Sequence, residues 1–289
     1  MAEKKAVIFS DKQEHSISIN AGCKYYGISR SSYYNKPKKR IEDKELDDLI
    51  IFFFDKSFQT YGSRRLKKSL KNIGITVDRG RLNQIMKRLN LVPVSDFSGS
   101  PKRNDYVVNN ATVFNILDRK FSGRGLYEVI ISDVTYTLIN GKWNYLCVMV
   151  DLCSRQILGY AVSDRHDASL VEQAFMSMQI DFYKIKIFHT DRGGEFMSKH
   201  LQEQLTYYGI ERSLSDKGCP IDNAVCESLF NTIKKEFIKR SVFVSLQEFA
   251  YYLRSYITFY NTERFHSSLG YHSPVEYAQM CLNGGLLYG

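Results

Sequence analysis

The chain has 289 residues, and its 44% apolar fraction can fill a sizeable core, which excludes a disordered chain. The formal net charge of +9 is uneven, because residues 1–120 carry 24 Lys and Arg against 13 Asp and Glu, whereas residues 121–289 carry 16 against 18. The sequence has no apolar run of 18 residues, no C-x-x-C pair and no apolar leader at its start. We therefore expect a cytoplasmic protein with reduced cysteines, and a basic front half that either binds a polyanion or is simply solvated.

Residues 1–40 contain a short helical unit followed by a basic linker. Gly27 is typical of a turn, and Ser29 is placed to cap the helix after it, a pattern similar to the middle of a helix-turn-helix. The run KPKKR at 36–40 then indicates the linker.

Residues 41–92 are expected to form a helical DNA-binding domain of three helices. Apolar residues recur at helical spacing from Leu46, a turn follows at 59–62, and Asp78 is placed to cap the third helix. The second helix carries Arg64, Arg65, Lys67 and Lys68, and the outer face of the third carries Asn83, Gln84, Lys87 and Arg88. Such side chains suit phosphates and base edges, although an ordinary three-helix bundle with a charged outside has the same pattern.

Residues 93–124 are rich in Pro, Gly, Ser and Asn and indicate a connector. A change of pattern then marks an expected catalytic domain at 125–242, closed by a C-terminal helix and tail at 243–289. The order β-β-β-α-β-α-β-α favours an α/β fold with a mixed five-stranded sheet and flanking helices. We expect strands at 126–139, 142–152, 156–163, 184–191 and 210–216, the first two joined by an Asn140-Gly141 hairpin turn, and helices at 169–179, 195–209 and 223–239.

Three acidic residues in this half stand at related places. Asp133 follows an apolar run, Asp191 ends a strand, and Glu227 lies on the helix from Asn223. Carboxylates at strand ends and on an adjacent helix can converge, and hard oxygen ligands of this kind suit Mg²⁺ or Mn²⁺. Any one of them alone is better explained as a surface charge or a turn residue, so the argument depends on the three together.

The same helix adds Lys234, which lies about 20° around the axis from Glu227. Asn223 and Asn231 share that side, away from the apolar stripe of the helix. One face therefore offers a carboxylate, a lysine and two amides, an arrangement that could hold a metal ion and the phosphate beside it.

The spacing Asp191-x₃₅-Glu227, with a lysine seven residues after the glutamate, resembles that of DDE transposases and retroviral-type integrases. Within that group the chain is similar to the second-reading-frame product of the IS3 family of bacterial insertion sequences. The motifs that carry this resemblance are SDVTYT at 132–137, HTDRGGEF at 189–196, KGCPIDNAVCESLFNTIKKE at 217–236, YNTERFHSSLGYHSPVEY at 260–277 and YGSRRLKKSL at 61–70.

The resemblance implies a ribonuclease-H-like catalytic domain in which Asp133, Asp191 and Glu227 ligate two Mg²⁺ or Mn²⁺ ions, with Lys234 near the cleaved phosphate. It further implies 3′-end cleavage and strand transfer at the terminal inverted repeats of the chain's own element. Expected partners are double-stranded DNA, a second copy of the chain in a dimer or higher oligomer, and the first-frame product; no membrane is expected, and the bacterial nucleoid is the expected location. The full set of candidate DNA contacts is Arg64, Arg65, Lys67, Lys68, Asn83, Gln84, Lys87, Arg88, Arg192, Asn223, Lys234, Arg264 and His266.

Three alternatives stay open at this point. The chain could be a nuclease that only hydrolyses, a helix-turn-helix regulator, or an assembly partner of a longer frameshift-fusion transposase. In the tail, Arg264 and His266 could either approach DNA or belong to a packing helix and its closing loop.

Overall fold

The computed structural model describes residues 2–15, 17–34, 43–94, 115–118, 123–216 and 223–284. They fall into two compact units, Met1–Asp48 and Leu49–Gly289, each considered by itself. The first unit contains α1 (Ala2–His15), α2 (Ile19–Tyr25) and α3 (Arg30–Tyr34). Gly27 has a φ of +64°, and the Ser29 hydroxyl accepts from the Ser32 amide at 3.0 Å, so the predicted turn and cap are confirmed. Helix α1 was not predicted, and the linker at 36–40 lies outside the described residues.

The three predicted helices that follow are present as α4 (Asp43–Lys56), α5 (Ser63–Asn72) and α6 (Arg79–Arg88). The Asp78 carboxylate accepts from the Gly80 amide at 2.7 Å and caps α6 as expected. Leu82, Ile85 and Met86 face the core of this helical part. The opposite face of α6 is exposed, so its polar side chains are available to a partner.

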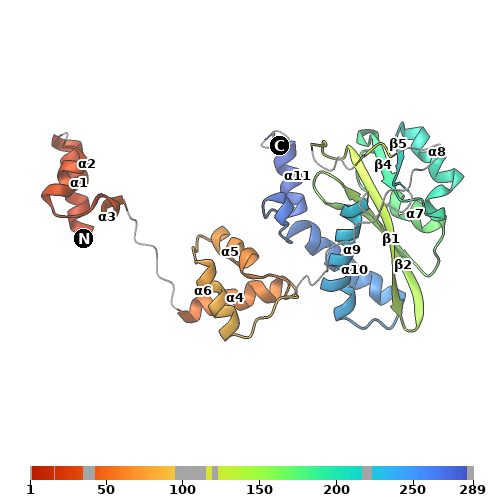
Figure 1. The fold of residues 1–289 in the computed structure, drawn as a ribbon, viewed down its shortest axis with the longest axis horizontal. Helices are drawn as coiled ribbons and strands as arrows, with labels where there is room; N and C mark the ends of the chain where they lie inside the picture. The colour runs from red at the N-terminus through yellow and green to blue at the C-terminus, as the bar shows by residue number, and fades with distance from the viewer. Residues whose placement is uncertain are drawn as a thin grey trace. The chain divides into compact units, whose positions relative to one another are not determined.

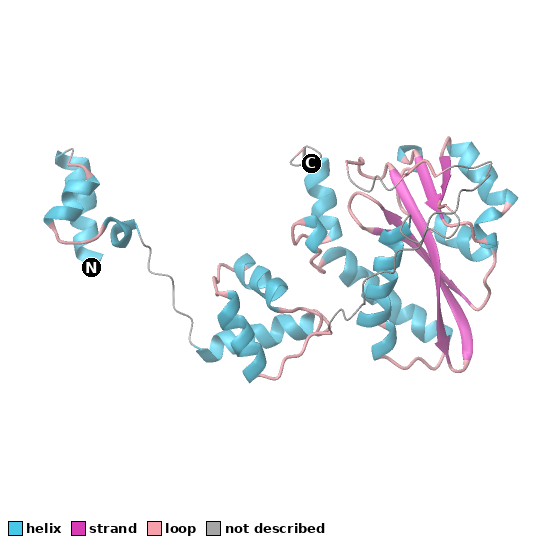
Figure 2. Cartoon of the chain, viewed as in Figure 1, coloured by secondary structure: helices cyan, strands magenta, loops and turns pink. Residues whose placement is uncertain are grey.

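A five-stranded mixed sheet forms the centre of the second unit (Figures 1 and 2). The strands are β1 (Val129–Ile139), β2 (Lys142–Asp151), β3 (Ile157–Ser163), β4 (Ile187–Thr190) and β5 (Glu211–Leu214), in the order β3-β2-β1-β4-β5. The first three pair antiparallel, whereas β1, β4 and β5 are parallel. Asn140 and Gly141 have φ values of +46° and +75°, which is the turn predicted between β1 and β2.

Helices cover both faces of the sheet (Figure 1). They are α7 (Ala168–Met176), α8 (Lys199–Tyr208), α9 (Ala224–Glu236), α10 (Leu246–Thr262) and α11 (Pro274–Leu282). The main apolar core lies between the sheet and α7 and α8, and includes Ile130, Met149 and Phe188. Gly159 lets α7 approach β3, since a Cβ there would stand 2.5 Å from the Ala174 carbonyl oxygen. Helix α9 packs against β1.

The predicted order of strands and helices is confirmed, and the fold class with it. The expected helix at 195–209 is in fact a short 3₁₀ turn, Gly194–Met197, and then α8, because the Ser198 hydroxyl accepts from the Leu201 amide and starts a new helix. Most of the connector at 93–124 lies outside the described residues. No helix in the described ranges is long and apolar enough to cross a membrane.

Candidate active site

Two of the three predicted carboxylates are brought to one edge by neighbouring parallel strands. Ile131 of β1 pairs with His189 of β4, and each acid follows two residues later, Asp133 within β1 and Asp191 just after β4. Side chains two residues apart share a face of the sheet, so both carboxylates lie on the side opposite Ile130 and Phe188. The backbone register thus explains why acids 58 positions apart in the sequence meet.

Both aspartates are held by local hydrogen bonds. The Val134 amide donates to Asp133 Oδ1 at 2.8 Å, and the Gly193 amide donates to Asp191 Oδ1 at 2.9 Å. His189, which precedes Asp191 in the HTD motif, is fully buried and hydrogen-bonds the hydroxyls of Ser213 and Ser215 at 2.8 and 3.1 Å. This histidine therefore anchors the end of β4 to β5 and fixes the loop that carries Asp191.

Helix α9 supplies the third carboxylate from the side of β1. Cys226, Leu229 and Ile233 are buried, whereas Glu227 is exposed and has no hydrogen bond or ion pair with any described residue. Lys234, two turns along, lies with its Nζ 5.0 Å from the centre of the Tyr136 ring on β1. Burial lowers the pKa of Lys234, and so does the charge of Lys239, while Asp133 raises it.

The charges of this region act on one another. Burial, together with the carboxylates of Asp191, Glu227 and Glu195, raises the pKa of Asp133 to about 7, and the hydrogen bond from the Val134 amide opposes this shift. Burial also raises the pKa of Asp191, with Glu195 adding to it, whereas the Gly193 amide and His166 lower it. Partial burial raises the pKa of Glu227. Like charges that oppose one another's ionisation favour a bound cation between them.

Sequence reasoning missed two residues beside these acids, Glu195 and His166. His166 Nε2 lies 3.0 Å from Glu195 Oε1, and its ring stacks on Tyr145 with centroids 4.8 Å apart. A Cβ at Gly193 would stand 2.5 Å from the Glu195 carboxylate, so this carboxylate lies directly beside the backbone of the loop that carries Asp191. The HTDRGGEF motif contains Glu195, so a fourth acid could have been found from the motif, but its histidine partner lies 29 residues away.

The carboxylates match a divalent-cation site in the chemistry of their donor atoms, but less well in the distances between them. All are hard oxygen donors, and Asp133 senses the charge of the other three. In the part of the chain that the structure describes, however, no three His, Cys, Asp or Glu side chains are grouped closely enough to hold a metal ion.

The predicted DNA-contacting side chains fall into an exposed and a buried group. Arg64, Lys67, Asn83, Gln84, Lys87 and Arg88 are exposed on α5 and α6, and Lys68 is partly exposed. Arg192 is partly buried and donates to the Ser215 carbonyl at 2.9 Å, while Asn223 is buried, and its amide has no hydrogen-bond partner among the described residues. The outer face of the helical part is therefore the most accessible basic surface in this set.

Arg264 and His266 are buried, with exposed fractions of 5% and 8%. The Arg264 guanidinium donates to both oxygens of Glu236 at the end of α9, Nε to Oε2 at 2.8 Å and Nη2 to Oε1 at 2.7 Å. Tyr256 of α10 donates to Glu236 Oε2 at 3.0 Å. This arrangement matches the packing alternative for the tail, because the guanidinium of Arg264 is already satisfied by a carboxylate.

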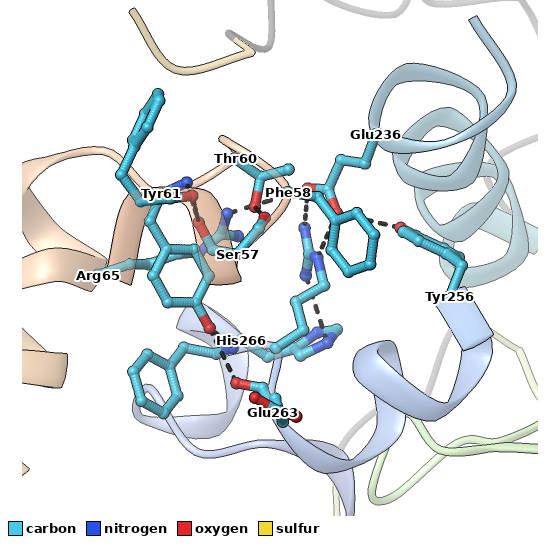
Figure 3. Close-up of polar contacts among 12 residues, drawn as sticks. Ser57, Phe58, Thr60, Tyr61, Arg65, Glu236, Tyr256, Glu263 and His266 are labelled. Atoms are coloured by element: carbon cyan, nitrogen blue, oxygen red, sulfur yellow. Dashed lines mark hydrogen bonds and ion pairs between the residues drawn. The ribbon is translucent and has the colours of Figure 1, made fainter. Parts of the chain in front are cut away.

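The same network holds the helical part against the catalytic part (Figure 3). The Tyr61 hydroxyl donates to the Glu263 carbonyl at 2.8 Å and accepts from the Phe265 amide at 3.0 Å. Arg65 of α5 lies over the Tyr61 ring, with its Nη1 4.0 Å from Glu236 Oε1. The turn before α5 is thus fixed to the segment after α10.

Protein-family models match both the helical part and the α/β part of the chain. Models for an integrase core domain match residues 125–220 and 208–274, and a model for an HTH-like domain matches 40–95. The catalytic core domain of HTLV-2 integrase, solved in complex with magnesium, aligns at 17% identity with a TM-score of 0.42, over 54% of this chain and 99% of that one.

Two transposases that align with this chain over nearly their whole length are about one-third identical to it. The transposase InsF of insertion sequence IS3A from Escherichia coli K12 is 31% identical over 93% of this chain and 97% of the relative. The transposase of insertion sequence element IS904 from Lactococcus lactis is 32% identical over 83% of this chain and 96% of the relative. The chain belongs to the family of insertion-sequence transposases that includes those of the IS3 elements.

Proposed function

We propose that this chain cuts and joins DNA at the terminal inverted repeats of its own insertion sequence, with Asp133, Asp191 and Glu227 as its catalytic residues. The observation that carries the proposal is the register of β1 and β4, which brings Asp133 and Asp191 to one sheet edge, facing the helix that bears Glu227. The membership of the family supports the reaction class, and the electrostatic coupling of the acids supports their joint role.

The three carboxylates would hold two Mg²⁺ or Mn²⁺ ions, which when bound activate the attacking oxygen and stabilise the leaving oxygen of a phosphodiester. The protein supplies the rest. β1 and the anchored end of β4 would position two ligands, and α9 would present the third from a packed helix. Lys234 is placed on the same face of α9 to meet a phosphate beside the carboxylates.

The exposed faces of α5 and α6 would bind the DNA backbone and bases. Arg64, Lys67, Lys87 and Arg88 carry positive charge there, and Asn83 and Gln84 can hydrogen-bond base edges. Joining two DNA ends requires two active sites, so we infer that the chain works as a dimer or higher oligomer on DNA.

A cleavage assay with separate binding readout tests this function. Asp133→Asn, Asp191→Asn and Glu227→Gln should each reduce Mg²⁺-dependent cleavage of DNA carrying the element's inverted repeats by about 10³-fold or more. DNA binding by each variant should stay within about twofold of that of the unaltered chain, because the basic helices are unchanged. Glu203→Gln, an exposed carboxylate on α8, is the matched control.

Metal binding gives a readout that does not depend on activity. Mn²⁺ bound to the chain, counted by electron paramagnetic resonance in the presence of DNA, should fall in each of the three amide variants and not in Glu203→Gln. Near-normal cleavage or undiminished Mn²⁺ binding in any one of the three would remove that residue from the ligand set.

A further inference from the structure

A cleft of about 330 Å³ lies on the flank of α9, next to the face that carries Glu227. Its walls come from α5, the turn between β2 and β3, the start of α9 and the segment after α10. Three arginines line it, Arg65, Arg155 and Arg264. We propose that this cleft binds a backbone phosphate of the DNA, distinct from the one that is cut, and that Arg155 is its principal ligand.

Arg155 is held in place by an unusually constrained turn. Its φ is +61°, a backbone conformation that side chains other than glycine rarely adopt. The buried carboxylate of Asp151 fixes this turn, since Oδ2 accepts from the amide and hydroxyl of Ser154 at 2.7 and 2.6 Å, and Oδ1 accepts from the Tyr127 amide at 2.9 Å. These hydrogen bonds fix the backbone of the turn, and with it the point from which the Arg155 side chain starts.

One nitrogen of the Arg155 guanidinium lacks an acceptor among the described residues. Its Nη1 atom is buried and has no hydrogen-bond partner among the described residues, although Arg155 lines the cleft. A buried charged donor without an acceptor is unfavourable, so a ligand oxygen would satisfy a group that the folded chain leaves unmatched.

The other two arginines, Arg65 and Arg264, contribute positive charge to the cleft rather than unengaged hydrogen-bond donors. Glu236 accepts both bonds from Arg264 and lies 4.0 Å from Arg65, so one carboxylate serves two guanidinium groups. Burial, together with the charges of Arg264, Arg65 and Arg155, lowers the pKa of His266 in the cleft wall to about 2. Three arginines therefore act on the same histidine, which shows that their positive charges lie close together at this cleft.

The first turn of α9 adds donors of a kind that anions use. Ala224 and Val225 line the cleft, and the side chain of Asn223, the residue that starts the helix, makes no capping hydrogen bond. The amides of this turn are therefore without a side-chain acceptor from the cap. Ser228 and Thr232, one turn apart on the same flank, bring two hydroxyl groups.

Two observations favour a DNA phosphate over a small free anion, and both rest on the proposed function. The cleft reaches the surface at Ser267 and Ser268, which are exposed, so a phosphate that belongs to a polymer can enter. Arg65 lies on α5, the helix that also carries the exposed Arg64, so the cleft and the basic face of the helical part share one helix.

The test is the salt dependence of DNA binding by the full chain. A fluorescently labelled duplex with the element's inverted repeat is titrated at several salt concentrations, and the slope of log affinity against log salt is compared among variants. Arg155→Gln should make the slope shallower by roughly 0.9, the value for one lost phosphate contact. Arg254→Gln, which removes an exposed arginine of α10 outside the cleft, should leave it unchanged.

A second variant tests the cleft independently, in case Arg155→Gln does not fold correctly. Ser268→Asp places a negative charge at the exposed mouth of the cleft and disturbs no buried group, and it should also weaken binding and reduce the slope. Inorganic phosphate, followed by thermal unfolding at constant ionic strength, probes the small-anion alternative.

The results of these measurements either support the proposal or overturn it. A reduced slope for both cleft variants supports the proposal. Slopes equal to that of the unaltered chain overturn it, and if phosphate then raises the unfolding temperature of the unaltered chain but not of Arg155→Gln, the cleft is a site for a small free anion. If the unaltered chain does not bind the duplex at all, the proposed function fails as well, which separates the two failures.

Discussion

Helix α9 carries two glutamates nine residues apart whose surroundings differ completely. Glu227, in its first turn, is exposed, has no partner among the described residues and adds negative charge to that felt by Asp133. Glu236, at its end, is buried and accepts hydrogen bonds from Arg264 and Tyr256. The same residue type on one helix therefore stands in two different environments, set by what faces it.

The two carboxylates differ in what replaces the water around them. Removing a buried carboxylate from water is unfavourable unless opposite charge and donors replace the water, as Arg264 and Tyr256 do for Glu236. A carboxylate that instead faces other carboxylates lowers stability slightly and has a use only when a cation arrives. We therefore expect Glu236 to determine folding and Glu227 to determine chemistry.

The largest expected effect on stability comes from breaking the buried pair. Glu236→Gln should lower the free energy of unfolding by about 3–5 kcal/mol, because it leaves the Arg264 guanidinium buried without a counter-charge. Burial opposes the charged form of Arg264, but Glu236 raises its pKa above the ordinary value, which shows how closely the two are linked. Urea unfolding measures the change.

The controls for this pair lie on the same protein. Glu203→Gln, whose Lys199 partner lies 3.5 Å away on the surface of α8, should change stability by less than about 0.5 kcal/mol. Glu236→Gln combined with Arg264→Met should be less destabilised than the two single variants summed. Additive losses would show that the pair is not the unit of stability.

A smaller loss of stability is expected when the pH is lowered, because of His266, which lies beside the Glu236–Arg264 pair. Burial, then Arg264, Arg65 and Arg155, lowers the pKa of His266 from its ordinary 6.5 to about 2. Between these values the unfolded chain binds a proton that the folded chain does not, so this contribution to stability is complete above pH 6.5 and is lost as pH falls. At pH 5 the loss amounts to about 2 kcal/mol.

The variant His266→Gln isolates that contribution. Its stability should fall less between pH 7 and pH 5 than that of the unaltered chain, by about the 2 kcal/mol above, when both are unfolded with urea. His200→Gln on the exposed side of α8 should keep the full dependence. Parallel pH curves for His266→Gln and the unaltered chain would show that this ring is not held neutral.

The smallest effect concerns the hydroxyl that fixes the helical part. Tyr61→Phe removes a donor to Glu263 and an acceptor for Phe265 and should cost about 1–2 kcal/mol. Hydrogen exchange of the Phe265 amide should accelerate at the same time. Tyr251→Phe, which changes an exposed ring on α10, is the control, and equal exchange rates in all three chains would contradict this role for Tyr61.

Local patterns in the sequence account for most elements of the helical part and of the sheet that follows it. The Asn140-Gly141 turn, the apolar strands and the Asp78 cap depend on neighbouring residues, and all were predicted. The placement of Asp133 and Asp191 at one edge follows from two strands being parallel neighbours. Helix α1 was not predicted, because the apolar periodicity of its sequence is weak.

Pairings between distant segments could not be predicted. Arg264 was expected either to reach DNA or to pack, and nothing near it in the sequence reveals that Glu236, 28 residues earlier, is its partner. The same holds for His166 with Glu195, and for Arg155, whose turn shows no motif. Each depends on tertiary packing, which residue types and spacing alone do not specify.

The most direct test measures cleavage and stability together in Glu227→Gln and Glu236→Gln. Glu227→Gln should lose cleavage by about 10³-fold or more while its unfolding midpoint stays unchanged or rises slightly, since one member of a repelling group is neutralised. Glu236→Gln should lose stability by several kcal/mol and, at a temperature where it remains folded, retain cleavage per folded chain. If Glu227→Gln cuts DNA normally, or if it unfolds as readily as Glu236→Gln, the division of α9 into a chemical and a structural carboxylate is wrong.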